Sequence, residues 1–148
     1  MIKTHDLLIG KEWRKSAHTV PVVNPFTQEA FAEVCLAGEQ EIEQAIGLAE
    51  KAFQTTRTQP AYLRSRICAN IAHTLRERSE EFAQTITLES GKPLTYARAE
   101  VARSSSTFEI AAQEALRLDG KLLTLDITEA TRGKAGLTRR RPIGPVAG

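Results

Sequence analysis

Helical periodicity over residues 39–118 is the sequence feature that most constrains the fold of this chain. Apolar residues recur there every three or four positions, a spacing that places them along one face of a helix. The first such stripe consists of Ile42, Ala45, Ile46, Ala49 and Phe53. It predicts an amphipathic helix over residues 39–54, and the glutamates in its first turns suit the positive end of a helix dipole.

Three further helices are predicted within the same region. Pro60 suits the first turn of the second helix, whose apolar residues are spaced at steps of four. Ser79 is a candidate N-cap for the third helix, and Gly91 is a typical helix stop. Pro93 opens the fourth helix, whose apolar stripe continues to about Leu118.

Extended segments are predicted on both sides of the helices. Leu7–Trp13 has a Gly-Lys turn between apolar stretches, which is typical of a β-hairpin. Residues 20–23 and 31–36 are further candidate strands around an Asn-Pro turn. Residues 122–128 and 137–141 alternate in polarity like a strand and its return strand. The predicted fold class is therefore mainly α with short β-hairpins.

The predicted strands are too few to cover four amphipathic helices. The chain also ends on the apolar run Val146-Ala147-Gly148. Both features point to a sheet that this sequence does not contain. Because large exposed apolar patches are rare on monomers, we expect self-association, with residues 137–141 as an edge for strand pairing.

The charge balance excludes broad classes of partner. Twenty Lys and Arg oppose eighteen Asp and Glu, so the net charge is only +2, which produces no field to steer nucleic acid or a membrane surface. Arg132, Lys134 and Arg139–Arg141 form a basic cluster, but no aromatic platform or basic helix accompanies it. We expect Arg139 and Arg141 on one strand face and Arg140 on the other. The arginines would either protect the strand edge from pairing with another chain or contact an acidic patch on a partner.

Location and redox state follow from similar reasoning. No apolar run approaches the roughly 20 residues of a membrane span, and residues 1–6 lack the apolar core of a signal peptide. A cytoplasmic location is therefore expected. Cys35 and Cys68 are too few for a disulfide framework, and we interpret both as buried thiols without a neighbouring base.

No catalytic, cofactor-binding or metal-binding site is predicted in this chain. It contains no GxGxxG, GxxxxGK[ST] or GxSxG motif. His5, His18 and His73 have no metal-ligand spacing with one another or with the cysteines. Ser104–Ser106 lies within a predicted helix, where serine is typical of a small or solvent-facing position rather than of a nucleophile.

Four segments together resemble the start of the aldehyde dehydrogenase superfamily. Leu8–Trp13 is similar to its opening hairpin, and Val23–Glu29 to its V-N-P-x-T-G-E turn. Leu88–Pro93, followed by Ala97, Ala99, Glu100 and Val101, is similar to E-x-G-K-P…A…E-V. Arg141–Gly148 is similar to the R-x-P-[LIV]-G strand. Its residues most resemble the branch that oxidises semialdehydes and, without using inorganic phosphate, glyceraldehyde 3-phosphate. The order of these segments, from Leu7 to Gly148, carries the resemblance.

The resemblance implies a reaction that this chain cannot perform alone. Family members oxidise aldehydes with NAD or NADP, through attack of a cysteine thiolate, an asparagine-containing oxyanion hole and a glutamate general base. Those residues and the cofactor motif belong to later parts of the family pattern. Cys35 and Cys68 do not match the nucleophile motif. The resemblance therefore predicts an inactive N-terminal fragment that binds no cofactor by itself.

The resemblance also divides the chain into three parts. Residues 1–118 correspond to the N-terminal hairpin and the helices of the Rossmann-like NAD(P)-binding domain. Residues 119–141 correspond to strands of an oligomerisation arm, and residues 142–148 to a return strand into the missing remainder. The expected partners are that remainder or a second copy of this chain. The alternative is a natural truncated relative that serves as a non-catalytic interaction module for a full-length dehydrogenase.

Two positions give more local expectations. Gln28 stands where the family usually has glycine, and a non-glycine residue disfavours a positive φ, so we expect this turn to be built differently. Some family members hold a monovalent cation near the position of Glu89. We interpret Glu89 and Lys92 instead as a charge pair at a helix end and predict no metal.

Overall fold

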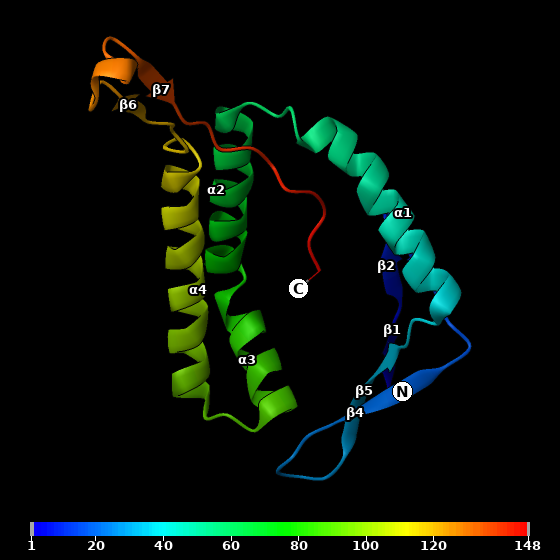
Figure 1. Ribbon diagram of the computed structural model, residues 1–148. Coiled ribbons are helices and arrows are strands. Elements are labelled where there is room, and N and C mark those ends of the chain that lie inside the picture. The colour runs from blue at the N-terminus through cyan, green and yellow to red at the C-terminus, as the bar shows by residue number, and fades with distance from the viewer. Residues whose placement is uncertain (1, 148) are drawn as a thin grey trace.

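Short strands come first and last along the chain, and four helices lie between them (Figure 1). The computed structural model describes residues 2–147. The elements are β1 (Lys3–His5), β2 (Leu7–Ile9), β3 (Glu12–Arg14), β4 (Thr19–Val23), β5 (Ala30–Cys35), α1 (Glu39–Thr56), α2 (Ala61–Glu77), α3 (Ser79–Ser90), α4 (Leu94–Glu114), β6 (Leu122–Thr124), a 3-10 turn (Glu129–Thr131) and β7 (Ala135–Leu137). This arrangement confirms a mainly α fold with short β-hairpins.

The N-terminal strands form two small sheets. β2 and β3 make the predicted antiparallel hairpin, with Leu8 opposite Trp13. β4 pairs antiparallel with β5, and β1 adds to the other edge of β5 in parallel, so the order is β1-β5-β4. The polar β1 was not predicted because Lys3-Thr4-His5 carries no apolar alternation. Its strand conformation depends on the neighbouring β5.

The loop between β4 and β5 keeps a left-handed residue. The expectation of a differently built turn at Gln28 is wrong, because its φ is +60°. The Gln28 backbone N–H donates to the Asn24 carbonyl at 2.8 Å, and its side-chain Nε2 donates to the Pro25 carbonyl at 2.7 Å. These bonds hold a conformation that glycine adopts more easily.

Helices α2, α3 and α4 form one packed layer (Figure 1). α3 follows α2 after a single residue, and α4 returns along both. The buried residues at these contacts are small, since small side chains let helix backbones approach closely. They are Ala72, Ala83, Ala97, Val101, Ser105 and Ala112.

Helix boundaries follow the predictions with two corrections. Arg78, rather than Ser79, is the residue before α3, and Ser79 is already helical without a capping side-chain bond. Gly91 ends α3 with φ +69°, as predicted. α4 ends at Glu114 rather than near Leu118, because residues 115–119 tighten into turns such as Leu116 N–H to the Gln113 carbonyl.

The C-terminal strands are shorter than predicted. β6 and β7 are three residues each, with Leu123 opposite Gly136, and the pairing stops near Thr138, whose N–H donates to the Lys121 carbonyl. Arg139–Arg141 are therefore not on a strand, and the expected strand 137–141 is wrong. Residues 142–147 also lack strand structure, because strand hydrogen bonds need a neighbouring chain and none pairs with them within residues 2–147; Gly148 lies outside the described residues.

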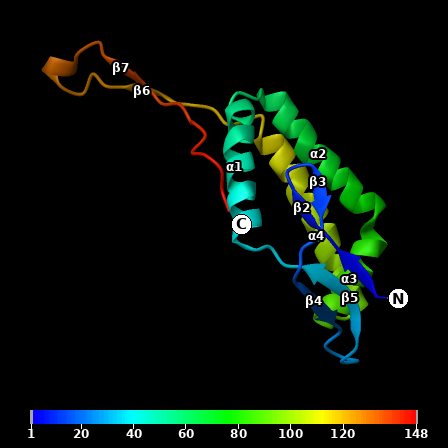
Figure 2. The ribbon, with the colours of Figure 1, turned by 90° about the vertical axis from the view of Figure 1, so that its right-hand side faces the viewer.

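Two parts extend away from the helical layer. α1 contains no buried residue, and its main contact is with β2, where Leu48 approaches Gly10. The β6–β7 hairpin projects from the body of the molecule (Figure 2). No helix within residues 2–147 combines the length and apolarity that crossing a membrane would need.

Candidate functional site

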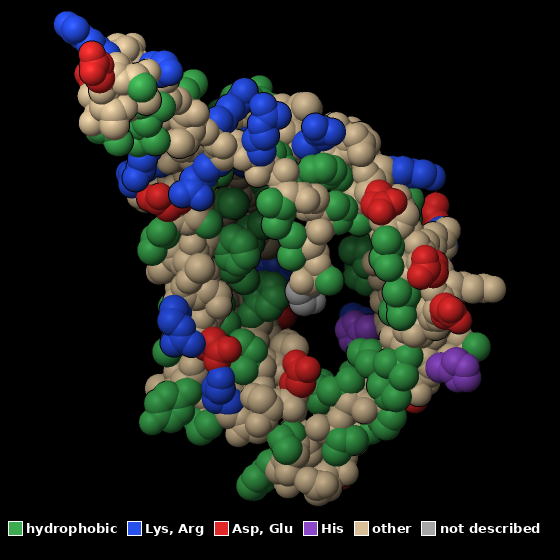
Figure 3. Space-filling view, in the orientation of Figure 1, with side chains coloured by type: hydrophobic (Ala, Val, Ile, Leu, Met, Phe, Trp, Pro, Cys, Tyr) green, Lys and Arg blue, Asp and Glu red, His purple; other side chains and the backbone are tan. Residues whose placement is uncertain are grey.

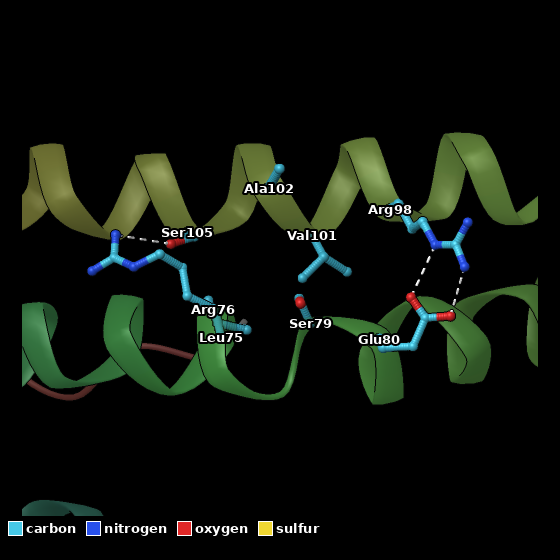
Figure 4. Close-up of a pocket in the computed structure, with 8 residues that line it drawn as sticks. All are labelled: Leu75, Arg76, Ser79, Glu80, Arg98, Val101, Ala102 and Ser105. Atoms are coloured by element: carbon cyan, nitrogen blue, oxygen red, sulfur yellow. Dashed lines mark hydrogen bonds and ion pairs between the residues drawn. The ribbon is translucent and has the colours of Figure 1, made fainter.

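A crevice lies where the α2–α3 junction faces α4 (Figure 4). Its volume is about 320 Å³. α2 and the start of α3 supply one wall and α4 supplies the other. The lining residues are Leu75, Arg76, Ser79, Glu80, Arg98, Val101, Ala102 and Ser105.

A bidentate ion pair closes one end of the crevice (Figure 4). Arg98 Nε donates to Glu80 Oε2 at 2.9 Å and Arg98 Nη2 donates to Glu80 Oε1 at 2.8 Å. These hydrogen bonds hold the pKa of the Glu80 carboxyl below its usual range and raise the pKa of Arg98. An ionised glutamate whose two oxygens both accept hydrogen bonds from an arginine is a poor general base. This pair therefore joins α3 to α4 and has no catalytic role in the crevice.

The other end of the crevice is also satisfied internally. Ser105 is buried, and its hydroxyl donates to the Ala72 carbonyl at 3.0 Å. Arg76 is paired with Glu109 and lies 3.5 Å from the Ser105 oxygen. No His or Cys lines the crevice, so Ser105 has no base to activate it. Ser105 is therefore a small residue that packs α4 against α2, in keeping with the role expected for a serine within a helix.

The two thiols occupy different environments. Cys35 is 6% exposed, and its Sγ accepts a hydrogen bond from the Ser16 backbone N–H at 3.4 Å. Its expected burial is confirmed. Cys68 is only half-buried, so the expectation was wrong there. One side of α2 is left uncovered, and Ile67 and Ile71 beside Cys68 are exposed as well.

The histidines and the carboxylates do not form a metal centre. His73 is exposed on α2 and lies 3.2 Å from Glu77, its neighbour one turn on. Between residues 2 and 147, no three His, Cys, Asp or Glu side chains converge where a metal ion could bind.

The expected charge pair between Glu89 and Lys92 is not formed. The left-handed Gly91 turns the chain, and Lys92 Nζ pairs with Glu100 on α4 instead. This pairing lowers the pKa of the Glu100 carboxyl. Glu89 is exposed and forms no salt bridge within the described chain.

Two motif segments that are distant in sequence meet in the fold. A Cβ atom placed on Gly91 would lie 2.9 Å from Pro25 Cγ. The Asn-Pro turn therefore packs on the end of α3. The sequence indicated each segment separately, and only the tertiary structure shows that the glycine also makes room for the proline.

The three consecutive arginines lie against the connection between α1 and α2. Arg139, Arg140 and Arg141 line a groove there together with Arg57 and Arg64. Arg139–Arg141 were expected on a strand edge, away from the arginines of the helices. No local signal links positions so far apart.

Comparison with known proteins identifies the family. The model of the aldehyde dehydrogenase family matches residues 13–148. The chain belongs to this family. The match includes the Asn-Pro turn, all four helices and the β6–β7 hairpin.

Relatives and solved structures agree with this assignment. Malonate-semialdehyde dehydrogenase 2 from Shouchella clausii is 36% identical over 149 residues, covering 99% of this chain and 30% of the relative. The crystal structure of aldehyde dehydrogenase 21 from Physcomitrella patens in complex with succinate gives a TM-score of 0.87 at 33% identity, over 93% of this chain and 29% of that one. The crystal structure of NADP-dependent glyceraldehyde-3-phosphate dehydrogenase from Bacillus halodurans, complexed with NADP, gives a TM-score of 0.89 at 28% identity, over 95% of this chain and 30% of that one.

The chain spans about 30% of the length of the curated relatives it matches. It corresponds to their N-terminal part. The catalytic cysteine, asparagine and glutamate that the resemblance implies were not assigned to any residue of this sequence.

Proposed function

We propose that this chain is the N-terminal portion of an NAD(P)-dependent aldehyde dehydrogenase and has no dehydrogenase activity by itself. The observation that carries the proposal is a family match over residues 13–148 that extends over only about 30% of the relatives' length. The proposed reaction of the whole enzyme is oxidation of an aldehyde to a carboxylic acid. The reactive cysteine and the residues that bind the cofactor would lie outside this sequence.

Uncovered apolar side chains support a structural role. Ile42 and Ile46 on α1 are 51% and 49% exposed, and Ile67 on α2 is 49% exposed. Exposed apolar area on this scale marks a surface that another element covers. The rest of the polypeptide is the proposed cover, in keeping with helices that flank a cofactor-binding sheet.

The proposed substrates are small semialdehydes, because the similar proteins include malonate-semialdehyde dehydrogenases and a glyceraldehyde-3-phosphate dehydrogenase. NAD and NADP remain equally supported, since solved neighbours hold one or the other. A cytoplasmic location and self-association through residues 119–141 belong to the same proposal. No contact with nucleic acid or with a membrane is proposed.

An activity assay tests this proposal directly. The purified chain is mixed with NAD⁺ or NADP⁺ and with malonate semialdehyde, succinate semialdehyde or glyceraldehyde 3-phosphate, and absorbance at 340 nm is followed. We expect no reduced cofactor above background. Turnover that disappears in Cys35→Ser or Cys68→Ser would assign the nucleophile to this chain and overturn the proposal.

A second function is favoured by the exposed helix faces and by the projecting β6–β7 hairpin. The chain would then be a non-catalytic module that binds a full-length dehydrogenase. Co-expression with a family member and co-purification on a tag separates the two functions. A stable 1:1 complex supports the module, whereas its absence together with activity of a longer gene product supports the first proposal.

A further inference from the structure

We propose that the groove between the α1–α2 connection and residues 139–142 binds a multivalent oxyanion of the phosphate class, such as a diphosphate. This inference goes beyond the proposed dehydrogenase function and does not rest on it. The groove has a volume of about 810 Å³, within the usual range of small-molecule sites. Its lining consists of Arg57, Thr58, Gln59, Pro60, Ala61, Arg64, Leu118, Arg139, Arg140, Arg141 and Pro142.

The charge of this lining is entirely positive. Five of its eleven residues are arginines and none is acidic. Figure 3 shows Lys and Arg side chains gathered on this side of the molecule, between the hairpin and α1. The net charge of the whole chain is only +2, so the positive charge is concentrated locally.

These arginines are not neutralised within the described chain. Salt bridges hold Arg14, Arg76, Arg78, Arg98 and Arg117, but none of the groove arginines takes part in one within residues 2–147. Guanidinium groups brought together without carboxylates repel one another. A bound anion removes that repulsion and gains charge-assisted hydrogen bonds.

Two of the groove arginines are held in position by neutral partners. The Arg57 guanidinium lies 5.7 Å from the centre of the Phe53 ring, a cation–π contact. Arg64 Nη1 donates to the Gln59 backbone carbonyl. Both contacts orient the side chains and leave their charge uncompensated, as a preformed anion site requires.

The start of α2 adds to the same field. Pro60 and Ala61 line the groove at the N-terminal end of this 17-residue helix, where the helix dipole is positive. α1 and α3 carry glutamates in their first turns, whereas α2 has no acidic residue there. The dipole of α2 is therefore not offset by its own sequence.

Three features of the groove suit a small multivalent oxyanion. The guanidinium fork matches phosphate geometry in a bidentate manner. Several arginines around one volume suit several negative charges close together, as on a diphosphate. Pro60 comes from the α1–α2 connection and Pro142 from the C-terminal segment, and each restricts the backbone of its own segment.

Titration calorimetry with sodium pyrophosphate at low salt tests the proposal. We expect one binding site on the wild-type chain. Removing two guanidinium groups in Arg139→Gln/Arg141→Gln weakens binding about tenfold or more. The matched control, Arg132→Gln/Lys134→Gln, also removes two positive charges but lies outside the groove, and we expect its affinity to stay within about twofold of wild type.

Amide chemical shifts locate the bound ion independently of affinity. We expect pyrophosphate to shift the amide signals of residues 57–64 and 139–141. Absence of binding, equal weakening in the control, or shifts confined to other segments would overturn the proposal. Tighter binding of a hexaglutamate peptide than of pyrophosphate would also overturn it, in favour of an acidic protein partner.

Discussion

At the scale of single residues, backbone conformation decides what is tolerated. Gly91 and Gln28 both have positive φ, but only Gly91 was expected to. Gly91 also has no room for a side chain, because Pro25 Cγ would lie 2.9 Å from a Cβ atom. Gln28 shows that hydrogen bonds to Asn24 and Pro25 can hold a conformation that the residue type disfavours.

Gly91→Ala is therefore expected to lower the free energy of unfolding by about 1–2 kcal/mol, since a left-handed alanine costs about that much before any clash with Pro25. Gly47→Ala is the matched control, because it lies inside α1 with nothing within 4 Å of a Cβ atom. It should stabilise the protein by about 0.5–1 kcal/mol. Urea unfolding of both variants checks the prediction, and a shift of the same sign in both would contradict it.

At the scale of elements, local signals predicted helices better than strands. α1 begins at Glu39, and α3 ends before Gly91, as the sequence indicated. Such helix limits depend on neighbouring residues along the chain. β1 and the end of β7 depend instead on a distant partner, β5 and Lys121 respectively. Arg139–Arg141 were therefore assigned to the wrong structure and their groove was missed.

One exposed ion pair connects α3 to α4 and another connects the α3–α4 loop to α4, and both carry a pH dependence. Arg98 lowers the pKa of Glu80, and Lys92 lowers that of Glu100, from an ordinary value of 4.5. Carboxyls with a depressed folded-state pKa contribute stability above pH 4.5 that is lost as the pH falls through the folded value. We expect the stability to decrease below about pH 4.5.

Arg98→Gln tests which pair is responsible. The variant should be less stable than wild type at pH 7. The difference should shrink as the pH falls through the lowered pKa of Glu80, below which this carboxyl is protonated in both proteins. Arg66→Gln on α2, an exposed arginine outside the salt bridges of the described chain, is the control and should leave the pH profile unchanged. Thermal unfolding at a series of pH values measures both. A difference that is constant with pH would contradict the assignment.

At the scale of the whole molecule, the described part buries few large side chains. No large side chain within residues 2–147 is fully buried, and the core cluster consists of Ala83, Ala97 and Val101 with half-buried neighbours. α1 carries no buried residue. Apolar surface exposed to this extent is unusual for a monomer.

We therefore expect α1 to contribute to self-association of the isolated chain, in addition to residues 119–141. Ile42→Ser/Ile46→Ser should lower the weight-average mass in sedimentation equilibrium towards that of a monomer, because about half of each isoleucine is exposed apolar surface. Lys51→Ser/Gln54→Ser, at exposed polar positions of the same helix, is the control and should not change the mass. Equal masses for all three proteins would contradict association through this face.

The sequence by itself determined the helical series, the first hairpin, the turn at Asn24-Pro25 and the family, because these follow from periodicity, from start and stop residues, and from motif order. The tertiary structure alone decided the pairing of β1, the contact of Pro25 with Gly91 and the arginine-lined groove. The physical reason is distance along the chain. Each of the latter features joins residues whose interaction depends on where the intervening helices and loops place them.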